Sequence, residues 1–384
     1  MTNRKPFVVK KRSVEDVIAG LPQARQFDGS LAPIDLFIGA AGFEERVLAV
    51  PTRLKETGTT IRGQALLGRY RTNPQDNALR ESELRPILED LGARIEVFDA
   101  DSPEGTVSAI TGALRALSGK ERHHVVLDIS GASSTLIFSA LSSLFRANTD
   151  FQLTVLYVAA ARYHEPESVG RDEPVMRWGQ QDFREVGVTE VDHNEIYSGI
   201  HHDHLPGFVV AFPSMYPARL QRCLSHLGVG PLSGADESVY WVLPTTTDDE
   251  HRWRQEAVKQ SLIGLIHGDA DQDSEVERKL PDGRHTHCDV SDYGGCIRIV
   301  MEQIDANAGA NISVIHMGTK LQAIGVALAL ASRPEVALVS ARPEAFAART
   351  YSQGVGHMLS IEFKELREIV QRMAQVGTLD VERA

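Results

Sequence analysis

Short apolar stretches and longer amphipathic segments alternate along residues 34–163. The apolar stretches have the length of β-strands, and the segments between them carry apolar residues at helical spacing. The predicted strands are 34–40, 61–70, 93–100, 123–130 and 151–163, and the predicted helices are 42–58, 73–92, 105–119 and 131–147. This alternation predicts βαβ units in a mostly parallel sheet, with helices on both faces because the crossovers are right-handed.

The same order of elements returns after residue 206. The predicted strands are 207–215, 238–247, 286–295, 311–319 and 336–344, and the helices are 216–228, 248–268, 296–309 and 320–332. In each half the penultimate strand ends in a small polar turn that precedes an unusually apolar helix. We therefore expect an α/β fold of two Rossmann-like, mostly parallel sheets. The shared order of elements, not residue identity, also suggests an internal duplication.

Residues 164–206 interrupt the alternation with a polar stretch that is rich in Gly and Pro. We expect an N-terminal leader over 1–33, a first lobe over 34–163 and a connection over 164–206 with one or two short strands. The second lobe then covers 207–384 and ends in the amphipathic helix 364–377.

Composition and charge narrow the classes of partner. The chain has 384 residues, of which 42% are hydrophobic and 24% charged, and its formal net charge is −12. An acidic surface argues against binding of duplex nucleic acid, although a local basic pocket can still bind a small phosphorylated ligand. Three separated cysteines, no signal-peptide pattern and no apolar run of membrane-spanning length predict a cytoplasmic protein without a membrane partner.

Two polar turns stand where an apolar helix is expected to begin. Gly318 and Thr319 end the predicted strand 311–319 and Lys320 begins the helix after it, and the stretch DISGASST, residues 128–135, spans the same junction in the first half. Ligands of open parallel sheets bind beyond the carboxyl ends of strands, where helix N–H groups and the positive helix end attract anions. The turns therefore predict phosphate or carboxylate binding, whereas the alternative interpretation is plain helix capping. The candidate ligands in the first half are Ser130, Gly131, Ser133 and Ser134.

The turns after the first strand of each half are further candidates. Gly39, Ala41, Gly42 and Phe43 keep the first turn open, and Ser214 lies in the corresponding turn of the second half. Glu44 and Glu45 follow in a first helical turn, and the helix dipole is a sufficient explanation for at least one of them.

Several other polar residues fit a ligand-binding role and a purely structural role about equally well. Arg342 follows the last strand of the second half and can close over an anion, with Tyr351 positioned to stack on a base. For Arg69, Tyr70 and Arg71 the same two interpretations are open. The arginines can hold a phosphate while the tyrosine stacks on a base, or all three lie in a solvated loop.

Several common site types are not supported. The sequence lacks the spacing of a Walker A loop and of a nucleophile elbow, and its first glycine-rich turn falls short of a dinucleotide fingerprint. The His-rich stretches 201–204 and 285–289 lack zinc-site spacing, so no metal is predicted. His316 beside the second polar turn is a candidate acid or base, or a satisfied core histidine. The sequence identifies no cofactor.

The two polar turns resemble the ligand-binding turns of CARF domains, the CRISPR-associated Rossmann-fold sensors. The resemblance implies a cyclic oligonucleotide second messenger bound at a two-fold interface. The implied contacts are 130–134 and 318–320, completed by the first-strand turns 39–43 and 213–215. Two departures are that the chain holds two such units and that no appended nuclease or winged-helix module is recognisable.

We therefore expect a sensor or regulatory protein that binds a nucleotide-like phosphorylated ligand between the lobes and acts in antiviral defence. A separate effector protein or a homodimer would receive the signal. The alternative is a nucleotide-processing enzyme, a phosphodiesterase, hydrolase or transferase, in which Lys320 stabilises transition-state charge. A third interpretation is a scaffold whose turns only cap helices.

Overall fold

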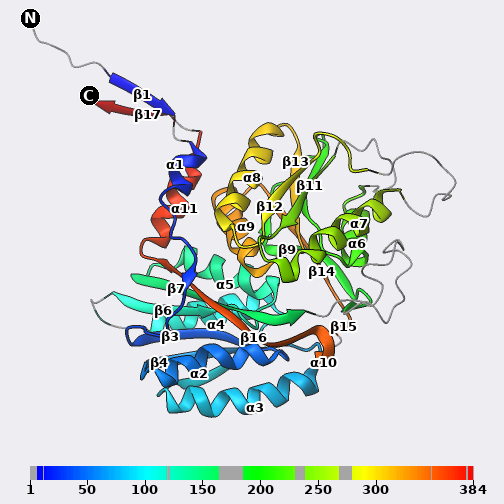
Figure 1. Ribbon diagram of the computed structural model, residues 1–384. Helices are drawn as coiled ribbons and strands as arrows, with labels where there is room; N and C mark the ends of the chain where they lie inside the picture. The colour runs from blue at the N-terminus through cyan, green and yellow to red at the C-terminus, as the bar shows by residue number, and fades with distance from the viewer. Residues whose placement is uncertain are drawn as a thin grey trace, which may run out of the picture.

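The computed structural model describes residues 7–11, 13–117, 119, 122–163, 185–229, 238–267, 279–346, 348–377 and 379–383. Two lobes each contain one sheet, and Figure 1 shows the first sheet below the second. No helix among these residues is both long and apolar enough to cross a membrane.

The first sheet has seven strands. Their order is β2 (Arg25–Gln26), β16 (Ser352–Phe363), β7 (Phe151–Tyr163), β6 (His123–Asp128), β3 (Ile34–Ala41), β4 (Ile61–Arg69) and β5 (Arg94–Asp99). The last five are mutually parallel, and β16 pairs antiparallel with β7 and β2.

The second sheet has six strands with a closely similar order. They are β12 (His285–Asp289), β11 (Val239–Thr245), β10 (Gly207–Phe212), β13 (Asn311–His316), β14 (Ala337–Arg342) and β9 (Glu190–Ser198). The first five are parallel and β9 is antiparallel to β14. The two mostly parallel sheets confirm the predicted α/β class. The matching strand order favours duplication, which stays a prediction.

Helices cover both faces of each sheet, as expected. The first lobe contains η1 (Glu45–Leu48), α2 (Ala49–Glu56), α3 (Pro74–Asp90), α4 (Pro103–Ala116) and α5 (Ser134–Arg146). The second contains α6 (Pro217–His226), η4 (Asp249–His251), α7 (Trp253–His267), α8 (Tyr293–Ala306) and α9 (Lys320–Ser332). The remaining elements are β1 (Phe7–Lys11), α1 (Val14–Ile18), β8 (Glu185–Val186), β15 (Ala345–Phe346), α10 (Ala348–Tyr351), α11 (Leu366–Ala374) and β17 (Leu379–Arg383).

The two lobes share one hydrophobic core, at whose centre α5 and α9 pack against each other (Figure 1). Every residue from 136 to 145 and from 321 to 330 is buried. Each helix packs on its own sheet on one side and on the other lobe on the opposite side. A helix buried on all sides needs mainly apolar or small residues on all sides, and the buried polar residues of α5 are serines, which explains the unusual composition of both segments.

Two outer strands come from outside the sequence segments that were expected to form their sheets. β16 lies in the segment assigned to the second lobe, but it pairs with β7 in the first sheet. β9 lies in the expected connection and forms the edge of the second sheet. Residues 164–184 of that connection lie outside the described residues, and the domain boundaries themselves stay a prediction.

Candidate functional site

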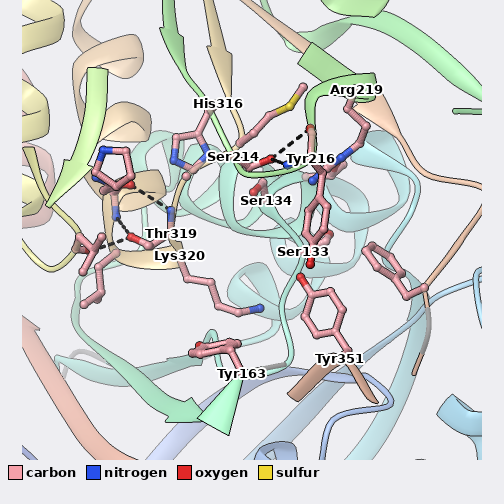
Figure 2. Close-up of a pocket in the computed structure, with 18 of the residues that line it drawn as sticks. Ser133, Ser134, Tyr163, Ser214, Tyr216, Arg219, His316, Thr319, Lys320 and Tyr351 are labelled. Carbon is pink, nitrogen blue, oxygen red and sulfur yellow. Dashed lines mark hydrogen bonds between the residues drawn. The ribbon is translucent and has the colours of Figure 1, made fainter. Parts of the chain in front are cut away.

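A cavity of about 600 Å³ lies between the lobes, lined by both of them. The turn between β6 and α5 contributes from the first lobe, and the turn between β13 and α9 contributes from the second. Both turns follow the carboxyl end of a strand and precede a helix, the usual position of a ligand in an open α/β sheet. The two helix starts therefore open into one shared space (Figure 2).

Lys320 is the first residue of α9 and extends into the cavity toward Tyr163 (Figure 2). Its ammonium donates a hydrogen bond to the carbonyl oxygen of Ala132, in the turn before α5. Burial and the nearby charge of Arg46 lower the pKa of Lys320 to about 8, although the carboxylates of Glu44 and Asp128 act in the opposite direction. The side chain is therefore largely protonated at neutral pH and close to its titration range.

Ser133 and Thr319 both cap their helices, as the plain capping interpretation expects. The Ser133 hydroxyl accepts from the backbone N–H of Leu136 at 3.2 Å. Thr319 forms a reciprocal capping box with Gln322, and its hydroxyl donates to the carbonyl of Val290 at 2.6 Å. Both residues also line the cavity. Capping thus uses part of each hydroxyl's bonding capacity and leaves ligand binding by these residues as a prediction.

A buried ion pair, Glu44 with Arg46, lies on the first-lobe wall. Arg46 donates to Glu44 at 2.7 Å and to the carbonyl of Val158 at 3.0 Å, and Ser352 donates to the second Glu44 oxygen. Burial acts to raise the pKa of Glu44, but the charges of Arg46 and Lys320 and these hydrogen bonds outweigh it and hold the pKa below its ordinary value. Glu44 therefore precedes η1 and points inward, whereas Glu45 lies in the first turn of η1, where the helix dipole accounts for it.

Asp128 ends β6 behind the first polar turn. Its carboxylate accepts from the backbone and hydroxyl of Ser130, whose hydroxyl also accepts from the N–H of Val158. Burial raises the pKa of Asp128 to about 6, despite the Ser130 hydrogen bonds and the charges of Lys320 and Arg46. The Ser130 hydroxyl thus joins β6, the turn and β7, and it does not face the cavity.

His316 ends β13 at the position that Asp128 has in β6. It is 8% exposed and lies against the rings of Phe138 and Phe212. Within the described residues neither ring nitrogen has a hydrogen-bond partner, and the same holds for the side-chain nitrogen of Gln322, which is 1% exposed. Burial and the charge of Arg219 lower the pKa of His316 to about 3, so the ring is neutral at physiological pH.

Three aromatic rings form a cluster at another part of the wall. Phe43 contacts Phe346 and Tyr351 at ring-centroid distances of 5.7 and 5.6 Å, and the latter two lie 5.5 Å apart. Two hydrogen bonds between Asn73 and the backbone of Phe346 hold this segment against the first lobe. The three rings lie tilted or edge-on to one another and give this part of the wall an aromatic surface against which a base can pack.

Most candidate residues from the sequence line this cavity. They are Gly42, Phe43, Gly131, Ser133, Ser134, Ser214, Gly318, Thr319, Lys320 and Arg342. Gly39 and Ala41 lie within β3 and do not line it, and Ser130 is fully buried. A role in ligand binding stays a prediction for all of them.

Several lining residues were not candidates. Tyr157 and Tyr163 come from β7 and Arg254 from α7, and the Arg254 guanidinium lies 4.3 Å from the centre of the Tyr163 ring. The two tyrosines stand at even spacing on the side of β7 that is otherwise apolar, the one signal that the sequence offered for them. Arg69 and Arg71, by contrast, form ion pairs with Glu81 and Asp99.

Metal binding has no geometric support in the described part of the chain. No group of three or more His, Cys, Asp or Glu side chains there is arranged to hold a metal ion.

Comparisons with known proteins give no family. No protein-family model matches the chain, and no curated protein sequence is similar to it. A Type III CRISPR defence DNA nuclease activated by cyclic oligoadenylate is similar in structure over 78% of this chain, with a TM-score of 0.41 and 11% identity, and the chain spans 64% of that nuclease.

Two other solved structures are more distant. The cytoplasmic domain of a prokaryotic cation chloride cotransporter has a TM-score of 0.22 and 10% identity over 80% of this chain and 95% of its own. A geranyl diphosphate methyltransferase has a TM-score of 0.18 and 10% identity over 47% of this chain and 66% of its own. TM-scores below 0.5 do not establish a common fold, so these likenesses leave the function open.

Proposed function

We propose that this chain is a sensor or regulatory protein that binds a nucleotide-like phosphorylated ligand in the cavity between its lobes. The observation that carries the proposal is the convergence of α5 and α9 on one cavity, with Lys320 of one turn bonded to Ala132 of the other. Two helix N-termini and an ammonium favour a phosphate group. The aromatic cluster of Phe43, Phe346 and Tyr351 adds a surface for a base.

The wider role follows from the CARF resemblance of the two turns. On the basis of that resemblance, the proposal includes a cyclic oligonucleotide second messenger as the ligand and antiviral defence as the role. Because the ligand would lie between two lobes that share a core, its binding can change their relative packing and so be transmitted to a separate effector protein or to a second copy of the chain.

Calorimetric titration with a panel of mono- and oligonucleotides tests the binding step. The wild type should bind at least one of them, and Lys320→Ala should weaken that binding while Lys55→Ala should not. Lys55 is a suitable control because it pairs with Asp90 on the exposed surface of the first lobe. Absence of binding at millimolar nucleotide, or equal binding by Lys320→Ala, would contradict the proposal.

A nucleotide-processing enzyme is the second candidate, favoured by one perturbed group. Lys320 lines the cavity with a pKa of about 8, and proton transfer is most effective for groups that titrate near the working pH. His316 is unsuited to this role because its pKa of about 3 keeps it neutral. Incubation with cyclic and linear nucleotides, followed by chromatography, distinguishes the candidates, since only the enzyme forms new products.

A further inference from the structure

The cavity wall breaks the approximate symmetry of the two lobes. The strands β6 and β13 hold equivalent places in their sheets, yet His316 at the end of β13 lines the cavity and Asp128 at the end of β6 does not. The first residue of the following helix is Ser134 in one lobe and Lys320 in the other. The two sides of the wall thus differ in charge at Ser134 and Lys320 and in the exposure of the strand end, so a ligand with two equivalent halves would meet two different environments.

Positive charge on the wall is also largely balanced. The lining cations are Arg46, Arg219, Arg254, Lys320 and Arg342. The lining carboxylates are Glu44, Asp101, Glu190, Glu195, Asp248 and Asp289. Arg46 pairs with Glu44 and Arg342 with Glu190, so these guanidinium groups already have an anion.

Arg254 lies over the Tyr163 ring, and Lys320 differs from Arg46 and Arg342 because its ammonium donates to a neutral carbonyl oxygen. A ligand phosphate can therefore approach it without first displacing a carboxylate from an ion pair. A second phosphate would face a wall whose carboxylates are at least as numerous as its cations, and like charges in a partly desolvated cavity repel strongly.

The second-lobe end of the cavity offers unused neutral hydrogen-bonding groups. Both ring nitrogens of His316 and the amide nitrogen of Gln322 lack partners, although each side chain is more than nine-tenths buried. Both side chains approach Gly318, where an added Cβ would lie 3.2 Å from the His316 Nε2 and 2.3 Å from the Gln322 Oε1, the amide atom that accepts from the N–H of Thr319. A neutral imidazole and an amide donor match the uncharged edge of a base or a sugar hydroxyl. Unpaired buried polar groups are costly, so a ligand that bonds to them gains affinity.

We infer that the cavity selects an asymmetric nucleotide with a single negatively charged phosphodiester, whose phosphate binds at Lys320 and whose uncharged polar end binds at His316 and Gln322. This inference rests on the proposed function and narrows its ligand class. It disfavours nucleoside triphosphates and also cyclic oligonucleotides, including the second messenger that the CARF resemblance suggests, because a cyclic oligonucleotide carries one phosphodiester per nucleotide.

A matched pair of probes tests the charge and the symmetry together. The dinucleoside monophosphate ApA carries one phosphodiester charge, whereas cyclic di-AMP has similar bulk, two charges and a two-fold axis. GpG and cyclic di-GMP repeat the comparison for guanine. Calorimetry at neutral pH and physiological salt should give a dissociation constant at least about tenfold lower for ApA or GpG than for the corresponding cyclic dinucleotide.

Variants test the two ends separately. Lys320→Met should weaken binding of the better linear probe by at least about tenfold and reduce its salt dependence, whereas Lys320→Arg should retain the preference. His316→Phe keeps a ring between Phe138 and Phe212, so it should weaken binding several-fold and leave the salt dependence unchanged. Thermal melting checks that each variant is folded, and Lys55→Met is the control for a lost surface ammonium.

The outcomes separate this inference from the proposed function. Equal or tighter binding of the cyclic dinucleotides overturns the inference but leaves the proposed function standing. Unchanged binding by His316→Phe overturns the assignment of the uncharged end. Absence of binding by all four probes and by the wider nucleotide panel overturns both.

Discussion

The buried pair of Glu44 and Arg46 allows a quantitative prediction for Arg46→Met. Arg46 is 3% exposed and Glu44 is 9% exposed, so the substitution leaves a carboxylate with little access to water. The unfavourable burial of this charge is avoided if the carboxylate takes up a proton. At pH 7 this protonation costs about 3.4 kcal/mol, because pH 7 lies 2.5 pH units above the ordinary pKa of 4.5 and each unit corresponds to about 1.36 kcal/mol. This value is a ceiling on the electrostatic part of the loss.

The substitution Arg46→Met also removes the hydrogen bond to the Val158 carbonyl. This loss adds to the electrostatic loss, since an unpaired buried carbonyl costs about 1–3 kcal/mol. We therefore expect Arg46→Met to lower the free energy of unfolding by about 3–5 kcal/mol at pH 7, as for other broken buried pairs. The electrostatic part should nearly vanish at pH 5, because protonation of Glu44 then costs little. The double variant Glu44→Gln with Arg46→Met should recover much of the loss at pH 7.

Urea unfolding followed by circular dichroism at both pH values measures these differences from the midpoint and slope. Arg252→Met is the matched control, because Arg252 and its partner Asp249 are 65% and 84% exposed and such pairs contribute about 0–1 kcal/mol. A loss below about 1 kcal/mol for Arg46→Met at pH 7, or a loss that is equal at pH 5, would refute the reasoning.

Three further predictions concern the ligand, the helix interface and a cap. Affinity for a phosphodiester probe should fall by up to about tenfold per pH unit above pH 8, because Lys320 loses its proton there in spite of nearby Glu44 and Asp128. Calorimetry across pH 6–9 measures this fall, which should be absent for Lys320→Met. Gly325→Ala should destabilise the protein by about 1–3 kcal/mol in urea unfolding, since its Cβ would lie 2.2 Å from the Tyr293 carbonyl, whereas Gly112→Ala in an open helical position should be neutral or stabilising. Thr319→Ala should cost about 0.5–2 kcal/mol in the same assay through loss of the capping box, and no change would contradict the capping role.

Local chemistry explains how much of the fold could be predicted. The strand 151–163 and the helix 320–332 have the same bounds in the structure as in the prediction, because a continuous apolar pattern and a helix cap define them. The segment 42–58 was predicted as one helix but begins as η1 before α2. The pairing of β16 with β7 could not be predicted, since it joins residues about two hundred positions apart through backbone hydrogen bonds that leave no local pattern.

The candidate site likewise contains residues that the sequence identified and residues that it did not. Ser133, Thr319 and Lys320 were found because helix starts have a recognisable composition, and the structure places all three at the cavity. Tyr163 and Arg254 reach it only through the packing of one lobe on the other. Ser130 fits the same local pattern as Ser133, yet the chain turns its hydroxyl toward Asp128. Composition therefore located the turn but not the direction of each side chain.

The exchange of outer strands limits how the chain can be divided. A fragment that ends at residue 206 would lack β16 and leave one edge of β7 without a partner, and a fragment that begins at residue 207 would do the same to β14 by omitting β9. Open edges of this kind recruit strands from other molecules, so each half expressed alone should aggregate. Co-expressed halves should instead reassemble, because each carries the strand that completes its counterpart.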